Sequence, residues 1–174
     1  MEKSNLVLIG MPGVGKSTVG VVLAKHLGLN FIDTDLQLQA KAGCRLQQII
    51  SERGLEKFLE LEEKVILDLR DRHSVIATGG SVIYSPFAMD ALRRTGHLIY
   101  LKISLQQLQQ RIDDMGQRGV VIEKNQSFSD LYDTRTRLYE QYAELTVNCD
   151  SQTANQVVQR VEIAVAQITG VCFP

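Results

Sequence analysis

An apolar run that leads directly into a glycine-rich loop and then a helical pattern constrains this chain more than any other feature. Residues 6–18 read Leu-Val-Leu-Ile-Gly-Met-Pro-Gly-Val-Gly-Lys-Ser-Thr, so residues 10–17 have the spacing Gly-x-x-x-x-Gly-Lys-Ser. Glycines allow backbone torsions that a Cβ atom would obstruct, and successive N–H groups then point at one anion. The helix predicted over residues 16–27 presents its positive end to the same anion. A strand before the loop and a helix after it favour a phosphate-binding loop over a simple turn.

The polar residues of this loop have separate predicted tasks. Lys16 is expected to reach the β- and γ-phosphates of a nucleoside triphosphate, and the Ser17 hydroxyl is expected to ligate a phosphate-bound Mg²⁺. The residues predicted to hold the nucleotide are Gly13, Val14, Gly15, Lys16, Ser17 and Thr18.

Size and composition narrow the class of protein. The 174 residues suffice for one α/β domain, and the net charge of −1 argues against a nucleic-acid binder. No apolar run approaches the ~20 residues of a membrane span, and residues 1–5 are too short and polar for a signal peptide. The three cysteines, Cys44, Cys149 and Cys172, lack metal-binding spacing and are expected to be reduced thiols. We therefore expect a cytoplasmic monomer that acts on a small molecule, without nucleic acid or membrane.

Short β-rich runs alternate with amphipathic helical patterns along the chain. Strands are predicted at Leu6–Gly10, Asn30–Asp33, Ser74–Thr78, His97–Lys102 and Leu145–Asn148. Helices are predicted near 16–27, 35–42, 45–51, 55–72, 86–95, 104–115, 127–143 and 153–169. This alternation predicts an α/β fold with a parallel sheet covered on both faces, and a ligand crevice beyond the carboxyl ends of the strands.

Two carboxylates follow the second predicted strand. Residues 30–35 read Asn-Phe-Ile-Asp-Thr-Asp, which places Asp33 and Asp35 at the point where strand becomes helix. Asp33 is placed to support the Mg²⁺ shell, directly or through water, and Asp35 to accept the proton of an attacking hydroxyl. A capping role at the start of the following helix is the alternative.

Paired glycines follow the third predicted strand. Residues 75–82 read Val-Ile-Ala-Thr-Gly-Gly-Ser-Val, so Gly79 and Gly80 end a buried β-branched run. Without Cβ atoms they let backbone N–H groups approach a ligand closely. A tight turn without a ligand is the competing interpretation.

Basic side chains accompany a stretch without clear periodicity. Residues 115–125 contain two glycines between two predicted helices, as is typical of a mobile lid, although a plain surface loop has the same composition. Arg118 lies in this stretch, Arg111 ends the preceding helix, and Arg135 and Arg137 lie on the following one. Arginines in this arrangement suit a developing phosphoryl charge, and we favour function for Arg118 and Arg135.

With these features together, the chain resembles the shikimate kinase family, P-loop enzymes with a nucleoside-monophosphate-kinase-like fold, from Gly10 to about Ala154. The matching residues are 10–18, 31–35, Gly54, Phe58, Glu62, 77–82, 100–101, Arg118, Arg135 and 138–139. The resemblance implies a five-stranded parallel sheet flanked by helices, in one kinase domain over residues 1–174. It also implies a substrate-binding helical region over about 35–62 and a mobile lid over about 115–125. The implied reaction transfers the γ-phosphoryl group of MgATP to a ring hydroxyl of shikimate.

The resemblance also implies roles for single residues on the nucleotide side. Lys16 and Ser17 hold phosphates and Mg²⁺, and Asp33 supports the metal. Arg118 is the catalytic lid arginine, in contact with the nucleotide, and Arg111 stacks near the adenine.

On the acceptor side, the resemblance makes Asp35 the base that contacts the acceptor hydroxyls. Gly79 and Gly80 lie against the substrate, and Arg135 grips its carboxylate. Lys16, Asp35 and Arg118 are thus the predicted catalytic residues.

The chain departs from the family pattern in the acceptor half. Leu59 stands where an arginine for the substrate carboxylate is expected, and the usual three glycines are two, Gly79 and Gly80. Lys57 is a poor substitute for that arginine, because two helical residues turn the side chain by about 200°.

These departures leave two other interpretations open. In the first, the chain is a kinase of another small hydroxylated metabolite, for which Leu59 provides an apolar wall. In the second, it is a catalytically weak nucleotide-binding module with a regulatory role. A nucleoside monophosphate kinase fits less well, because an acidic pair suits hydroxyl groups better than a phosphate.

Overall fold

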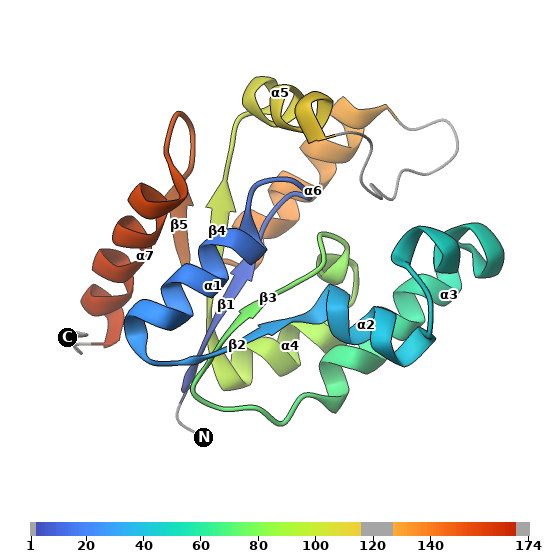
Figure 1. Cartoon of the computed structure of the whole chain (residues 1–174), viewed down its shortest axis with the longest axis horizontal. Helices are drawn as coiled ribbons and strands as arrows, with labels where there is room; N and C mark the ends of the chain where they lie inside the picture. The colour runs from blue at the N-terminus through green and yellow to red at the C-terminus, as the bar shows by residue number, and fades with distance from the viewer. Residues whose placement is uncertain (1–2, 116–126, 170–174) are drawn as a thin grey trace.

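The computed structural model describes residues 3–115 and 127–169, and its centre is one parallel sheet (Figure 1). In this part of the chain five strands lie in the order β2-β3-β1-β4-β5, with every neighbouring pair parallel. The strands are β1 (Asn5–Ile9), β2 (Asn30–Asp33), β3 (Ser74–Ala77), β4 (Gly96–Lys102) and β5 (Leu145–Asn148). The five-stranded parallel α/β sheet predicted from the sequence is confirmed.

Helices cover both faces of this sheet. They are α1 (Lys16–Leu27), α2 (Thr34–Ala42), α3 (Leu46–Asp68), α4 (Pro86–Thr95), α5 (Leu105–Met115), α6 (Phe128–Tyr142) and α7 (Ala154–Thr169), with a 3₁₀ turn η1 (Val82–Tyr84). Helices α1 and α7 pack together on one face, whereas α4 packs on β4 and against α3 on the other (Figure 1). Among the residues described, no helix has the length and apolarity to cross a membrane.

The core follows from the residue types of the central strands. Every residue of β1 and β3 is buried, and β4 is buried except at His97 and Lys102. Strands covered by helices on both faces require such continuous apolar runs instead of an alternating pattern. A second, smaller cluster joins α2 to α3 through Leu38, Ile49, Phe58 and Val65.

Most element boundaries agree with the sequence predictions to within one residue, and the main difference is at α3. The predicted helices 45–51 and 55–72 form one element with a kink at Gly54, whose φ of 81° and ψ of 166° are not helical. The element ends at Asp68, because Leu69 is extended. The turn η1 was not predicted, since three residues are too few to produce a hydrophobic period.

The carboxyl ends of the strands place three loops at one edge of the sheet (Figure 1). The loop after β1, the junction of β2 with α2, and the loop after β3 meet there. This is where ligands bind in open parallel sheets. Apart from Met115, the predicted lid over residues 115–125 lies outside the described residues.

Candidate active site

The loop between β1 and α1 has the backbone shape of an anion cradle. Gly10, Gly13 and Gly15 have φ values of 146°, 85° and 106°, which L side chains rarely adopt. At Gly10 a side chain is excluded by space as well, because a Cβ atom would lie 2.7 Å from the Leu101 carbonyl oxygen. Gly15 is also the N-cap of α1 and has no side-chain cap, so the first N–H groups of this helix remain available to an anion.

Lys16 is folded back across this loop. Its Nζ atom donates hydrogen bonds to the carbonyl oxygens of Gly10 at 2.7 Å and Met11 at 3.0 Å, and the residue is 7% exposed. Burial lowers the pKa of Lys16 to about 8, although the nearby Asp35 carboxylate acts in the opposite direction. The ammonium group therefore lies inside the cradle, in an environment that a phosphate would make more favourable for its charge.

Ser17 and Asp33 join the loop to the end of β2. The Ser17 hydroxyl donates a hydrogen bond of 2.6 Å to Asp33 Oδ2. Asp33 Oδ1 accepts the backbone N–H groups of Asp35 and Leu36, so Asp33 is also the N-cap of α2. The capping interpretation of this aspartate is therefore confirmed, whereas its support of Mg²⁺ stays a prediction, made for a carboxylate that accepts a hydrogen bond from Ser17.

These residues fit a magnesium ion that arrives with a nucleotide. Within residues 3–115 and 127–169, no group of three or more His, Cys, Asp or Glu side chains could hold a metal ion alone. Mg²⁺ in phosphate complexes keeps several waters and is held by one or two protein oxygens in addition to phosphate oxygens. The Ser17–Asp33 pair matches that donor set.

Gly79 lies where the acceptor groups converge. A Cβ atom at this position would lie 2.1 Å from Glu62 Oε1 and 2.8 Å from Asp35 Oδ1. The Gly79 N–H group donates to the Thr34 hydroxyl at 3.2 Å, which ties the loop to α2. Only glycine fits here, and its lack of a side chain lets two carboxyl groups approach the same backbone.

Glu62 is a buried carboxyl group that was not among the predicted site residues. It is 3% exposed, its Oε2 accepts a hydrogen bond of 2.6 Å from the Ser81 hydroxyl, and its Oε1 has no hydrogen-bond partner in the described chain. Burial raises the pKa of Glu62 to about 7, and the neighbouring charge of Asp35 acts in the same direction. Desolvation likewise raises the pKa of Asp35, against the pull of Lys16.

Arg135 comes from α6 and lies beside Gly80. A Cβ atom on Gly80 would lie 3.2 Å from an Arg135 terminal nitrogen and 2.8 Å from the Pro12 ring. Arg135 is 1% exposed, its Nε donates to the Tyr84 hydroxyl at 3.2 Å, and its guanidinium carbon lies 5.2 Å from the centre of the Tyr84 ring. The Tyr139 hydroxyl holds the Gly80 carbonyl at 2.6 Å.

The structure therefore brings most of the predicted site residues together. The phosphate loop, Asp33, Asp35, the glycine pair and Arg135 surround one edge of the sheet, with Lys16 electrostatically coupled to both aspartates and to Arg135. Arg111 lies beside the loop and donates to the carbonyl oxygens of Val14 at 3.0 Å and Cys149 at 3.3 Å, while its stacking on adenine stays a prediction. Arg118 lies outside the described residues.

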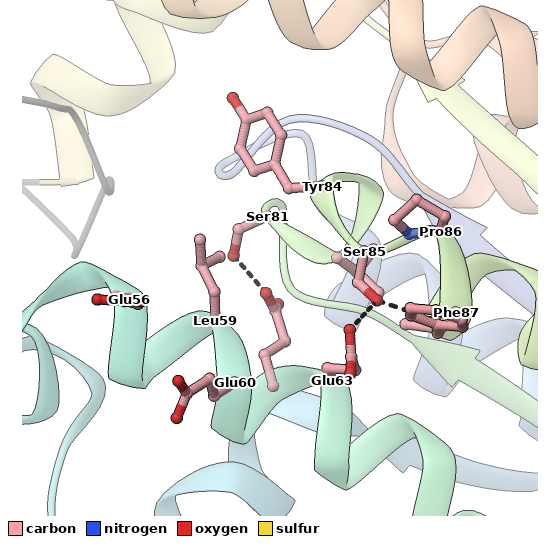
Figure 2. Close-up of a pocket in the computed structure, with 12 residues that line it drawn as sticks. Glu56, Leu59, Glu60, Glu63, Ser81, Tyr84, Ser85, Pro86 and Phe87 are labelled. Atoms are coloured by element: carbon pink, nitrogen blue, oxygen red, sulfur yellow. Dashed lines mark hydrogen bonds between the residues drawn. The ribbon is translucent and has the colours of Figure 1, made fainter.

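A cavity of about 310 Å³ adjoins this site, between α3 and the segment that runs from Ser81 into α4 (Figure 2). Leu59 extends from α3 toward Ser81 and Tyr84. Among the described residues, twelve line this cavity, and they include four glutamates and no lysine, arginine or histidine. Lys57 does not replace the missing arginine, because it pairs with Glu60 at 2.7 Å and its side chain is 62% exposed.

Two residues of the site were missed by sequence reasoning. Glu62 was noted only as part of a family pattern, and that pattern was the signal that marked it. Tyr84 had no signal, since it lies in η1, which no periodicity indicated. Both owe their place to contacts between elements distant in the sequence.

Known proteins resemble this chain in sequence and in fold. The model of the family described as shikimate kinase matches residues 12–166. A shikimate kinase of Xylella fastidiosa (strain 9a5c) is 36% identical over 154 residues, which are 87% of this chain and 86% of that protein. A shikimate kinase of Histophilus somni (strain 2336) is 34% identical over 169 residues, which cover 92% of this chain and 97% of that protein. The solved shikimate kinase from Acinetobacter baumannii in complex with shikimate superposes with a TM-score of 0.88 at 28% identity, over 96% of this chain and 95% of that one.

Proposed function

The chain belongs to the shikimate kinase family, and we propose that its site transfers the γ-phosphoryl group of ATP to a ring hydroxyl of shikimate. The observation that carries this proposal is the arrangement around Gly79 and Gly80. Gly79 lies against two carboxyl groups, Asp35 and Glu62, and Gly80 lies against the buried cation Arg135 and the Pro12 ring of the phosphate loop. An acceptor that carries both hydroxyl groups and a carboxylate fits between those groups.

The donor half uses the loop after β1. The N–H groups of the loop and of the first turn of α1 bind the phosphates, and Lys16 exchanges its two carbonyl partners for phosphate oxygens. Arg111 steadies the loop through Val14 and lies where the base of the nucleotide is expected. Such a site works by positioning and by electrostatic stabilisation of the transferring group.

Mg²⁺ enters with the nucleotide in this proposal. Ser17 would hold it, and Asp33 would orient the Ser17 hydroxyl or a metal-bound water. When bound, the ion supplies charge neutralisation to the phosphates. Arg118 is proposed to add a second positive charge from the lid over residues 115–125.

The acceptor half uses α2, the glycine pair and α6. Asp35 accepts the proton of the attacking hydroxyl, which matches its position beside Gly79 and its coupling to Lys16. Arg135 binds the carboxylate of the acceptor, and the helical region over residues 35–62 forms the wall of the pocket. Glu62 donates or accepts a hydrogen bond through Oε1, which has no hydrogen-bond partner among the residues that the structure describes.

We further propose that the enzyme acts as a cytoplasmic monomer. Cys44 and Cys149 are free thiols, as is usual in a reducing compartment.

Leu59 favours a second candidate within the same reaction class. The described residues that line the cavity beside it include four glutamates and no cationic side chain, which suits a hydroxylated acceptor without a carboxylate. This candidate keeps the roles of the donor half and of Asp35 unchanged.

A coupled ADP-release assay with MgATP separates the two candidates. Shikimate, quinate, gluconate, homoserine and nucleoside monophosphates are compared at equal concentrations. A clear preference for shikimate supports the first candidate. Turnover with another acceptor and silence with shikimate would replace it by the second.

A further inference from the structure

We propose that Tyr84 is the specificity-determining positioning residue of the acceptor site, where it holds Arg135 in the orientation that recognises a carboxylate. This inference rests on the proposed function, since it concerns how the same site binds an acceptor with a carboxylate. It adds a residue that lies outside the phosphate loop, the aspartates and the glycine pair.

The backbone of Tyr84 is fixed close to the substrate position. Its N–H group donates to the Ser81 carbonyl at 2.9 Å, one residue after the glycine pair, and Pro86 starts α4 two residues later. The ring points away from α3 (Figure 2). Tyr84 is 39% exposed. Tyr84 is therefore part of the rim of the site, supported by a short turn that leaves its backbone little freedom.

Tyr84 contacts Arg135 in two ways. The hydroxyl accepts the hydrogen bond from Arg135 Nε, and the ring lies under the guanidinium at a distance typical of a cation–π contact. Together they constrain both the position and the tilt of the planar group. A guanidinium binds a carboxylate best in a bidentate geometry, so its tilt determines how well it binds.

The chemistry of this partner also matters. A phenol is neutral, so it orients Arg135 without neutralising it, whereas a carboxylate in the same place would compete with the substrate. Tyr84 therefore adds no negative charge beside the buried guanidinium of Arg135. At an exposure of 1%, its solvation by water is nearly lost, which makes an anionic ligand more favourable still.

Leu59 makes this orientation more important. Where the family pattern has a second arginine, this chain has an aliphatic side chain that lines the same cavity as Tyr84. With one cation fewer, carboxylate recognition depends more strongly on the geometry of Arg135. Tyr84 and Leu59 thus form two sides of one altered acceptor pocket.

The test compares Tyr84→Phe, which removes only the hydroxyl, with Tyr84→Leu, which removes the ring as well. We expect Tyr84→Phe to raise KM for shikimate by roughly 3- to 10-fold, in line with one hydrogen bond, and Tyr84→Leu to raise it further. The KM for ATP and kcat should change by less than about twofold, because neither variant touches the donor half. Tyr132→Phe is the matched control. Tyr132 lies on α6, the helix that carries Arg135, and the variant loses a comparable hydrogen bond from its hydroxyl to the Ile103 carbonyl oxygen.

Two further arms separate positioning from a merely structural role. Shikimate methyl ester lacks the charged carboxylate, so Tyr84→Phe should leave its KM unchanged. In an Arg135→Lys background, the effect of Tyr84→Phe on shikimate should disappear as well. A general loss of structure would raise KM for both acceptors in both backgrounds and would contradict the proposal.

The outcomes also distinguish this inference from the proposed function. An active wild-type enzyme with an unchanged KM in both Tyr84 variants would overturn the role of Tyr84 alone. A wild-type protein that neither binds nor phosphorylates shikimate would overturn both.

Discussion

The ammonium nitrogen of Lys16 lies 2.7 Å from the carbonyl oxygen of Gly10, inside the loop that phosphates are expected to occupy. The lysine is thus held in place before the nucleotide arrives, at the cost of desolvation that lowers its pKa to about 8. In the proposed mechanism, binding of ATP replaces these carbonyl oxygens by phosphate oxygens, which would stabilise the charged lysine more strongly.

This environment predicts a pH dependence of ATP binding. Above pH 8 the free protein loses the Lys16 proton, whereas the phosphate-bound protein keeps it. The Kd for MgATP should therefore rise by up to roughly tenfold per pH unit above 8, and binding there should take up protons. Titration calorimetry in two buffers of different ionisation enthalpy measures both quantities. Equal Kd values at pH 7 and pH 9, without proton uptake, would refute the role of Lys16 as a phosphate ligand with a lowered pKa. As a control, Lys16→Ala should bind ATP poorly at both pH values.

Replacement of the proposed base gives a second prediction. Asp35→Asn keeps the size of the side chain but cannot accept a proton, so kcat should fall by about 10²- to 10⁴-fold. The Kd for ATP should stay within about twofold, since Asp35 lies on the acceptor side. Steady-state rates and equilibrium titration of the same preparation test this, with the exposed Asp68→Asn as control. A variant that retained most of the wild-type rate would show that Asp35 is not the base.

The buried carboxyl of Glu62 gives a third prediction, on stability. Its pKa is about 7 in the folded protein against an ordinary value of 4.5, so the folded state holds this proton more tightly than the unfolded state. The stabilisation is complete below pH 4.5 and decreases as pH rises to 7, by up to about 3 kcal/mol for this shift.

Glu62→Gln removes this titration while keeping an oxygen for Ser81. Relative to the wild type, the variant should therefore gain stability as the pH rises from 5 to 8. Urea unfolding at several pH values measures the difference. Parallel stability profiles for the two proteins would contradict the raised pKa.

The departure at residue 59 gives a fourth prediction. Leu59→Arg places a cation beside the acceptor and near Glu62, and should improve kcat/KM for shikimate by roughly 10- to 150-fold, as for one charge-assisted hydrogen bond. Leu59→Met is the control for size without charge. No gain with arginine would indicate that the pocket has been rebuilt around another acceptor.

The local parts of this structure could be predicted from the sequence. The unit made by β1, the glycine loop and α1 depends on neighbours in the chain, so residues 6–18 sufficed to predict its shape. The break at Gly54 was likewise apparent, because a glycine between two helical patterns has local consequences. The end of α3 at Asp68 was missed by four residues, since helix ends depend on weak local preferences.

The contacts that complete the site could not be predicted in this way. Glu62 lies beside Gly79 because α3 packs against η1 and α4, and no local pattern encodes that packing. Tyr84 and Arg135 are 51 residues apart in sequence. Burial decides the pKa of Glu62, and burial is a property of the folded chain, not of a motif.

Identification of the product tests the central claim most directly, because ADP release alone does not distinguish phosphoryl transfer from hydrolysis of ATP. The purified protein is incubated with MgATP and shikimate, and the products are analysed by phosphorus NMR and mass spectrometry. We expect one new phosphomonoester whose mass is that of shikimate monophosphate, formed in equal amount with ADP. ADP accompanied only by inorganic phosphate, with shikimate recovered unchanged, would contradict the assignment of this site as a shikimate kinase.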